Sequence, residues 1–347
     1  MTISKFIDQK DSTNQVIIST LDSFLISKDS SLFQNRFWLE SDFDKYKFPF
    51  LDLYRIEFEN NNPEVYNANL LEIIELENPN DFLVKIAFVG RDSSGMSVLK
   101  SIYNLIANVE SDKVIFSRSL NHFVSKWKKV ERYPMTYFIS PNKELNEKEV
   151  ADQLDDIERL NSYFDTDSIE MTYYSCTSPI ELFQLKGFDY LPGMYFSKKG
   201  GIVEFGNHVF SGNSSEYYTH EIVHIYVNTL FPGANSLLNE GIAMYFGGSG
   251  GETYEWHRKA LLMYVKNKPN FNFLEYMNAF DKKYVNETTS IPYMTGALIY
   301  QFVIDNYGKE TFFKMLGSRK AIWESLEIVG LTKENLNKEL LAKLKNG

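Results

Sequence analysis

Residues 217–226 read YYTHEIVHIY, and this stretch decides how the second half of the chain is expected to fold. On a helix, residues four apart share one face. His220 and His224 can then direct their imidazoles to one point, while Glu221 projects beside them. Two histidines one turn apart with an adjacent glutamate are typical of a zinc site that carries its own general base.

The sequence before the motif predicts a strand followed by the start of a helix. GGIVEFGNHVF, residues 200–210, is expected to form the strand. Asn213 and Glu216 have the spacing of a capping box, in which two side chains satisfy free backbone N–H groups at a helix N-terminus. This pattern predicts that the HEIVH segment is helical.

A zinc site in a hydrolase usually has three protein ligands and leaves a fourth position for water. One known pattern takes a third histidine from the same segment, but Val227 and Leu230 occupy the positions that this pattern requires to be glycine and histidine. The alternative is a glutamate on the next helix. The segment NEGIAMYF follows the loop FPGAN, and fifteen residues lie between His224 and Glu240. The second helix can therefore run back and bring Glu240 to the histidines.

Three segments together resemble the gluzincin metallopeptidases, the group that contains thermolysin and the aminopeptidase N-like enzymes. They are HEIVH, NEGIAMYF and IPYMTGALIYQFV, the last at residues 291–303, and the resemblance covers roughly residues 134–330. It implies a zincin-like domain with a mixed sheet and a helical C-terminal part. It also implies Zn²⁺ as the cofactor, with an NEG-type glutamate, Glu240, as the third ligand beside His220 and His224.

The same resemblance assigns the catalytic roles. In the aminopeptidase N-like motif Y-x-x-G-A the tyrosine stabilises the tetrahedral intermediate, and Tyr293 with Gly296 and Ala297 matches it. With Glu221 as the general base for a metal-activated water, the expected function is a zinc-dependent peptidase that acts on a peptide or protein substrate.

The departures from the family pattern concern substrate recognition. Aminopeptidase N-like enzymes have a longer interval before the ligand glutamate, and they carry a G-x-M-E-N segment whose glutamate binds the free amine of the substrate. This chain has GIVEF at residues 201–205, so Glu204 is the candidate for that role, without the neighbouring methionine and asparagine. Endopeptidase action is therefore favoured over aminopeptidase action. Two other functions stay open: a catalytically inactive, peptidase-like binding protein, and a zinc hydrolase of a non-peptide substrate.

The remaining histidines have no metal motif around them. His257, in EWHRK, is interpreted as a lone surface histidine that could serve as an alternative donor, and His122 and His208 are interpreted as structural. The segment GGSGG at residues 247–251 lacks the Lys-Ser/Thr ending of a phosphate-binding loop, so it is expected to be a flexible turn.

The first half of the chain predicts a separate α+β domain. QVIISTLDSFLI, residues 15–26, has helical spacing of apolar positions. Four strand-like segments joined by turn-rich pieces follow, which favours an antiparallel sheet of neighbouring hairpins: residues 67–77, 81–91, 98–110 and 113–123. A helix followed by such a meander resembles the NTF2-like or cystatin-like α+β cones in pattern.

The pattern changes after Tyr133 and Pro134. Segments with the features of a strand, a helix, a strand and a helix follow at residues 135–140, 146–164, 169–176 and 178–187. The predicted fold class is therefore α+β, with an N-terminal domain of unknown role at residues 1–133 and the metallopeptidase domain at residues 134–347.

Composition limits the partners that are expected. The formal net charge of -10 and the pI near 5.2 argue against nucleic-acid binding, which usually needs a basic face. One cysteine, Cys176, excludes an internal disulfide. The longest apolar stretches are too short to span a membrane, and the first residues do not resemble a signal peptide. The expected location is soluble and cytoplasmic as written, or periplasmic or secreted if a signal peptide had been removed; the oligomeric state stays open.

Overall fold

Two compact units make up the protein, and each draws on two separate stretches of the chain. The computed structural model describes residues 1–57, 66–111, 113–196 and 198–346. Unit 1 comprises Met1–Leu145 and Met171–Ser214, and unit 2 comprises Asn146–Glu170 and Ser215–Gly347. Both sheets belong to unit 1, whereas unit 2 is built from helices, which confirms the predicted α+β class.

The first sheet of unit 1 is the predicted meander. Its four long strands pair antiparallel with their neighbours in chain order: β2 (Tyr66–Glu75), β3 (Asp81–Arg91), β4 (Ser97–Glu110) and β5 (Lys113–Arg118). Two short strands extend it, with β1 (Thr2–Ile3) parallel to β2 and β9 (Phe188–Tyr190) antiparallel to β4. The last predicted strand is shorter than expected, because the chain turns into helix α4 (Leu120–Val124).

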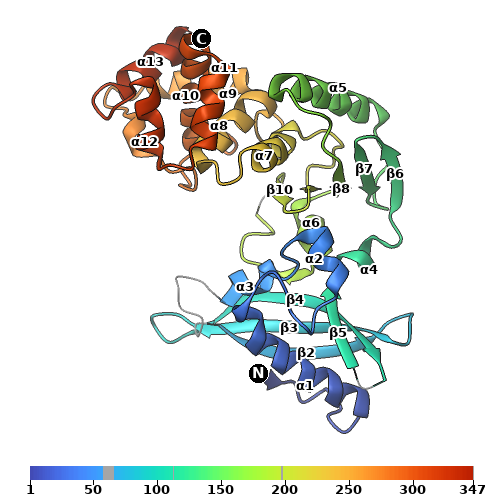
Figure 1. Ribbon diagram of the computed structural model, residues 1–347. Helices are drawn as coiled ribbons and strands as arrows, with labels where there is room; N and C mark the ends of the chain where they lie inside the picture. Colours follow the sequence, from blue (N-terminus) through green and yellow to red (C-terminus); the bar gives the residue numbers. More distant parts are fainter. Residues whose placement is uncertain (58–65, 112, 197, 347) are drawn as a thin grey trace. The chain divides into compact units, whose positions relative to one another are not determined.

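Helix α1 (Ser12–Ser27) lies against this sheet (Figure 1) and contacts β4 and β5. Asp11 caps it by accepting a hydrogen bond from Asn14 N at 2.8 Å. Its fully buried residues are spaced by four and three, as one face of a helix requires: Ile17, Leu21 and Phe24. Two short helices, α2 (Glu40–Tyr46) and α3 (Leu51–Glu57), and a 3-10 turn (Lys28–Ser30) follow α1.

The second sheet of unit 1 is mixed. Its strand order is β10 (Gly201–Glu204), β11 (His208–Ser211), β8 (Met171–Ser175), β7 (Met135–Ile139) and β6 (Lys128–Arg132). The three central strands are parallel, and each edge strand pairs antiparallel with its neighbour. Helix α6 (Pro179–Leu185) follows β8, and Ser178 caps its N-terminus.

This sheet corrects the predicted boundary between residues 1–133 and 134–347. Tyr133 and Pro134 lie in the turn of the hairpin that pairs β6 with β7. A chain that crosses directly between two paired strands stays within one unit, so the division falls elsewhere. Residues 135–145 and 171–214 belong to unit 1 rather than to the unit that carries the HEIVH segment.

The single strand predicted at residues 200–210 is in fact a hairpin. Strands β10 and β11 pair antiparallel, and Glu204 lies opposite His208. Residues 205–207 form the turn between them, with Gly206 at φ +83° and Asn207 at φ +60°. Both residues adopt the left-handed conformation that tight hairpin turns require, and Gly and Asn adopt it most readily.

Helices form the described part of unit 2, and α10 (Ile291–Tyr307) lies at its centre, in contact with α8, α9, α11 and α13. Most of its residues are buried. The other helices are α5 (Glu147–Phe164), α7 (Thr219–Leu230), α8 (Ser236–Gly247), α9 (Tyr254–Lys266), α11 (Lys309–Gly317), α12 (Ile322–Leu326) and α13 (Leu336–Asn346), with 3-10 turns at Phe273–Tyr276 and Glu327–Val329. Across the described residues of both units, no helix is long and apolar enough to cross a membrane.

Candidate metal centre

Helix α7 carries the HEIVH segment, as predicted, and α5 holds its first turn. Gln153 of α5 accepts a hydrogen bond from Tyr218 N at 2.7 Å and donates one to Thr219 Oγ1 at 3.1 Å. Thr219 in turn donates to Asp156 Oδ2 at 2.6 Å. These bonds satisfy polar groups at the helix start, which is buried, and they fix the direction in which the helix leaves it.

The predicted capping box does not form. Helix α7 begins at Thr219, after Tyr218, and no side chain caps it. Asn213 lies in unit 1, where its Oδ1 accepts from Gly200 N at 2.7 Å. Glu216 lies in unit 2 and accepts from Asn146 N at 3.1 Å. An N-cap must directly precede its helix, and Asn213 is separated from α7 by a loop.

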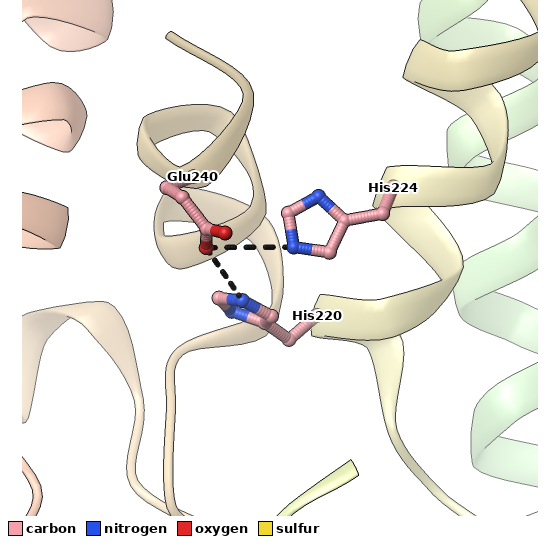
Figure 2. A group of neighbouring side chains, drawn as sticks. All are labelled: His220, His224 and Glu240. Carbon is pink, nitrogen blue, oxygen red and sulfur yellow. Dashed lines mark ion pairs between the residues drawn. The ribbon is translucent and has the colours of Figure 1, made fainter. Parts of the chain in front are cut away.

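Helix α8 brings the third predicted ligand to the two histidines. The loop after α7 ends at Asn235, which caps α8 by accepting from Leu237 N at 3.0 Å. Glu240 follows in the second turn. One of its carboxylate oxygens, Oε2, lies 3.3 Å from His220 Nε2 and 3.5 Å from His224 Nε2. Figure 2 shows the three side chains pointing toward one another from α7 and α8.

The spacing of these three atoms fits one small cation. The ligand atoms of His220, His224 and Glu240 all lie within 4.8 Å of one another. Two ligands held by one tetrahedral zinc ion at about 2.0–2.1 Å are about 3.3–3.4 Å apart, close to the distances between Glu240 Oε2 and both imidazoles. Glu240 Oε2 is buried and faces both imidazoles without a hydrogen bond of good geometry to either, so a cation between the three atoms would satisfy it.

The other nitrogen of each imidazole already has a partner. His220 Nδ1 lies 2.6 Å from Gly248 O, and His224 Nδ1 lies 2.9 Å from Asn239 Oδ1. A carbonyl oxygen only accepts, so Nδ1 of each ring carries a proton, and Nε2 is the nitrogen that faces Glu240. Metal-binding histidines typically donate their second N–H in this way, which fixes the ring and its tautomer.

Charges within the group influence one another. Burial raises the pKa of the Glu240 carboxyl, but His220 and His224 outweigh burial and hold that pKa well below its ordinary value. Burial lowers the pKa of His224, and contact with Glu240 outweighs it and raises the pKa to about 9. Glu240 therefore stays ionised beside the two imidazoles.

Glu221 and Tyr293, the two residues with predicted catalytic roles, lie beside this group. Glu221 is buried on α7, and its charge raises the pKa of His224 and of Tyr293. The ring of Tyr293, on α10, stacks on the ring of His220 with centroids 5.9 Å apart. Burial, followed by the charges of Glu240 and Glu221, raises the pKa of the Tyr293 phenol. Unit 2 therefore gathers all five predicted site residues.

Two glycines set how closely α8 and α10 approach each other. A Cβ on Gly241 would lie 2.3 Å from the carbonyl carbon of Gly296, and a Cβ on Gly296 would lie 2.3 Å from Leu237 O. Any larger side chain would push the helices apart. Gly241 directly follows Glu240, and Gly296 is three residues after Tyr293, so this crossing sets how closely Glu240 and Tyr293 approach each other.

The turn after α8 also belongs to the centre, although the sequence predicted only a flexible turn. A Cβ on Gly247 would lie 2.1 Å from His220 N, so only glycine allows the chain to pass that close. The Gly248 carbonyl accepts the hydrogen bond from His220 Nδ1. Gly248 has φ +64° and ψ −149°, a conformation that is essentially restricted to glycine. The cluster of glycines at residues 247–251 was the sequence signal for this close approach. Asn239, the partner of His224, could have been noticed as the first residue of NEG.

Three other sequence interpretations have different outcomes. His257 is fully buried, so its interpretation as a surface histidine was wrong. His208 is buried in unit 1, where its Nε2 lies 3.0 Å from Lys45 O, which fits a structural role. His122 is exposed on α4 and contacts the ring of Phe123.

Glu204, the candidate for amine recognition, has cationic partners within unit 1. Its carboxylate contacts Arg118 Nη1 at 2.7 Å and Lys186 Nζ at 2.5 Å. Burial raises the pKa of Glu204, but these two cations outweigh it and lower the pKa well below its ordinary value. Lys186 also lies 3.3 Å from Asp52. The Glu204 carboxylate is thus already neutralised by buried charges of its own unit.

Comparison with the models of known protein families and with curated proteins finds no match for this chain.

Proposed function

We propose that the protein is a zinc-dependent peptidase whose metal centre is formed by His220, His224 and Glu240. One observation carries the proposal: two Nε2 atoms and one carboxylate oxygen converge on a single point, with spacings of 3.3 and 3.5 Å. Two nitrogens and one oxygen form a donor set that suits Zn²⁺ and leaves a fourth position for water. The hydrogen bonds at both Nδ1 atoms support the same assignment.

When bound, zinc would supply a Lewis acid that acidifies water and polarises a carbonyl group. Glu221 accepts the proton of the attacking water and then passes it to the departing amine. Tyr293 donates a hydrogen bond to the oxygen on which negative charge develops. The close crossing at Gly241 and Gly296 supports this division of roles, because it holds Tyr293 at a fixed distance from Glu240.

The proposed mode of cleavage is endopeptidase action. Recognition of a free α-amine needs a carboxylate that is not already neutralised, since an unpaired ammonium is costly to bury. Glu204 forms ion pairs with Arg118 and Lys186. Its carboxylate is therefore already neutralised, which argues against a role in binding the amine of a substrate.

A peptide library tests the function and the cleavage mode together. Zinc-loaded protein should cleave some of its members, and Glu221→Gln should retain zinc but lose turnover by roughly 10²- to 10⁴-fold, the usual scale for a general base. Glu255→Gln, which changes an exposed glutamate on α9, is the matched control and should keep the parental rate.

Other results would contradict the proposed function or the proposed mode of cleavage. If the wild-type protein cleaves no peptide, or if Glu221→Gln cleaves the best one at the parental rate, the proposed function is wrong. The best substrate should also be cleaved after N-acetylation, because an endopeptidase does not read the terminal amine. Loss of cleavage on acetylation would instead establish aminopeptidase action.

A further inference from the structure

The buried histidine of α9 is connected to both sides of the candidate metal centre. His257 Nε2 lies 2.9 Å from Ser249 O, and its Nδ1 lies 2.8 Å from Thr289 Oγ1. Since a carbonyl only accepts, Nε2 carries the proton, and Nδ1 accepts from the threonine hydroxyl. A neutral imidazole therefore satisfies both partners in a fully buried position.

One of these contacts leads to the ligand His220. Ser249 directly follows Gly248, whose carbonyl receives His220 Nδ1 at 2.6 Å. The successive carbonyls of Gly248 and Ser249 thus accept hydrogen bonds from two imidazoles, that of His220 on α7 and that of His257 on α9. The hydrogen bond from His257 fixes the peptide unit beside the one that orients His220.

The other contact leads to Tyr293. Thr289 is fully buried and directly precedes Ser290, the residue that caps α10 by accepting from Tyr293 N at 3.4 Å. The Thr289 backbone is held by hydrogen bonds with Asn286 and Val285. The hydroxyl that His257 binds therefore belongs to the loop that places the first turn of α10.

We propose that His257 is a positioning residue, which holds the Gly248–Ser249 turn behind His220 and the Thr289–Ser290 start of α10 behind Tyr293 in one fixed arrangement. The inference rests on the proposed metal centre. The hydrogen bonds of His257 go to Ser249 O and Thr289 Oγ1, so its effect on His220 and Tyr293 passes through the two segments that carry these groups. It orients the His220 ring for the metal and at the same time places the ring of Tyr293, which stacks on it.

Zinc affinity of the folded protein is the measurement that tests this role. Loss of groups that orient metal ligands typically lowers metal affinity 10- to 100-fold. His257→Phe removes both hydrogen bonds, and we expect the zinc dissociation constant, measured by competition with a chelator, to rise about tenfold. His257→Gln can donate to Ser249 and accept from Thr289, so it should recover most of the affinity. Thr289→Val keeps the side-chain shape and removes the hydroxyl, so it should weaken zinc binding in the same direction without depending on whether the phenylalanine variant folds.

His208→Phe is the matched control, because His208 is also buried, contacts a backbone carbonyl and lies in unit 1. It should lower stability and leave the zinc affinity of the folded protein unchanged. Wild-type zinc affinity in folded His257→Phe and Thr289→Val would overturn the positioning role and leave the metal centre intact. Failure of the wild-type protein to bind zinc would overturn the metal centre, and this inference with it.

Discussion

At the scale of single residues, the sequence predicted which side chains come together in the candidate centre but not what holds them. His220 and His224 were predicted from helical spacing, which acts locally, and Glu240 from the loop before it and the resemblance of NEGIAMYF to the gluzincin pattern. The partner of His220 is the backbone carbonyl of Gly248, distant in sequence, and no side-chain pattern encodes it. Such contacts depend on how the turn after α8 folds back over α7.

His257 illustrates how local polarity can mislead. Its neighbours in EWHRK are polar or amphipathic, which suggested exposure. The buried residues of α9 are Tyr254, His257, Leu261 and Val265, spaced by three, four and four along one face of the helix. The helical period therefore predicted burial better than the composition of the segment did.

A stability prediction belongs to His208. Burial lowers the pKa of this imidazole to about 4, and its hydrogen bond to Lys45 O offsets only part of that effect. The unfolded chain takes up a proton near pH 6.5 and the folded protein near pH 4, so the neutral histidine stabilises the fold at high pH, and this stability is lost as the pH falls through that window. This difference between the pKa values of the unfolded and folded states corresponds to about 3 kcal/mol in the free energy of unfolding.

Urea unfolding at several pH values checks this prediction. Between pH 7 and pH 4, His208→Gln should lose about 3 kcal/mol less free energy of unfolding than the wild-type protein. Carboxylates titrate in the same range in both proteins and cancel in the comparison. Equal losses in the two proteins would show that His208 is not buried in its neutral form.

At the scale of elements, periodic segments were predicted well and their ends were not. Helices α1, α5 and α7 and the strands of the meander follow from their apolar periodicity. The hairpin at Gly206 and Asn207 and the start of α7 were missed. The start of α7 depends on Gln153 of α5, which lies outside the segment, and the hairpin depends on a turn inside the segment that apolar periodicity does not reveal.

The glycines of the NEG and Y-x-x-G-A motifs have a structural role in packing α8 against α10. Gly241 of NEG and Gly296 of Y-x-x-G-A pack directly against each other, so both motifs describe one helix crossing. Gly296→Ala should lower the free energy of unfolding by about 1–3 kcal/mol, the usual cost of overpacking, even without metal. Gly317→Ala is the matched control, since a Cβ there meets only Phe231 Cδ1 at 3.7 Å. Urea denaturation of the metal-free variants measures both, and equal stability of the two would argue against a tight crossing.

At the scale of the whole molecule, the fold class was predicted and the division of the chain was not. Composition and periodicity indicate which elements form, which is sufficient for the α+β class. The boundary at Tyr133 and Pro134 was wrong because β8, β10 and β11 join the sheet of β6 and β7, whereas α5 belongs with α7. Strand pairing between distant segments decides this, and it leaves no trace in local periodicity. The expected likeness to NTF2-like or cystatin-like cones and to gluzincins stays a prediction.

The zinc content of purified, dialysed protein tests the central claim most directly. The wild-type protein should hold about one zinc ion per chain, and His122→Ala, which changes an exposed histidine of unit 1, should hold as much. His220→Ala and Glu240→Ala should each lose most of the metal, because two ligands hold zinc far more weakly than three. Full zinc retention in both variants would contradict the assignment of His220, His224 and Glu240 as the metal centre.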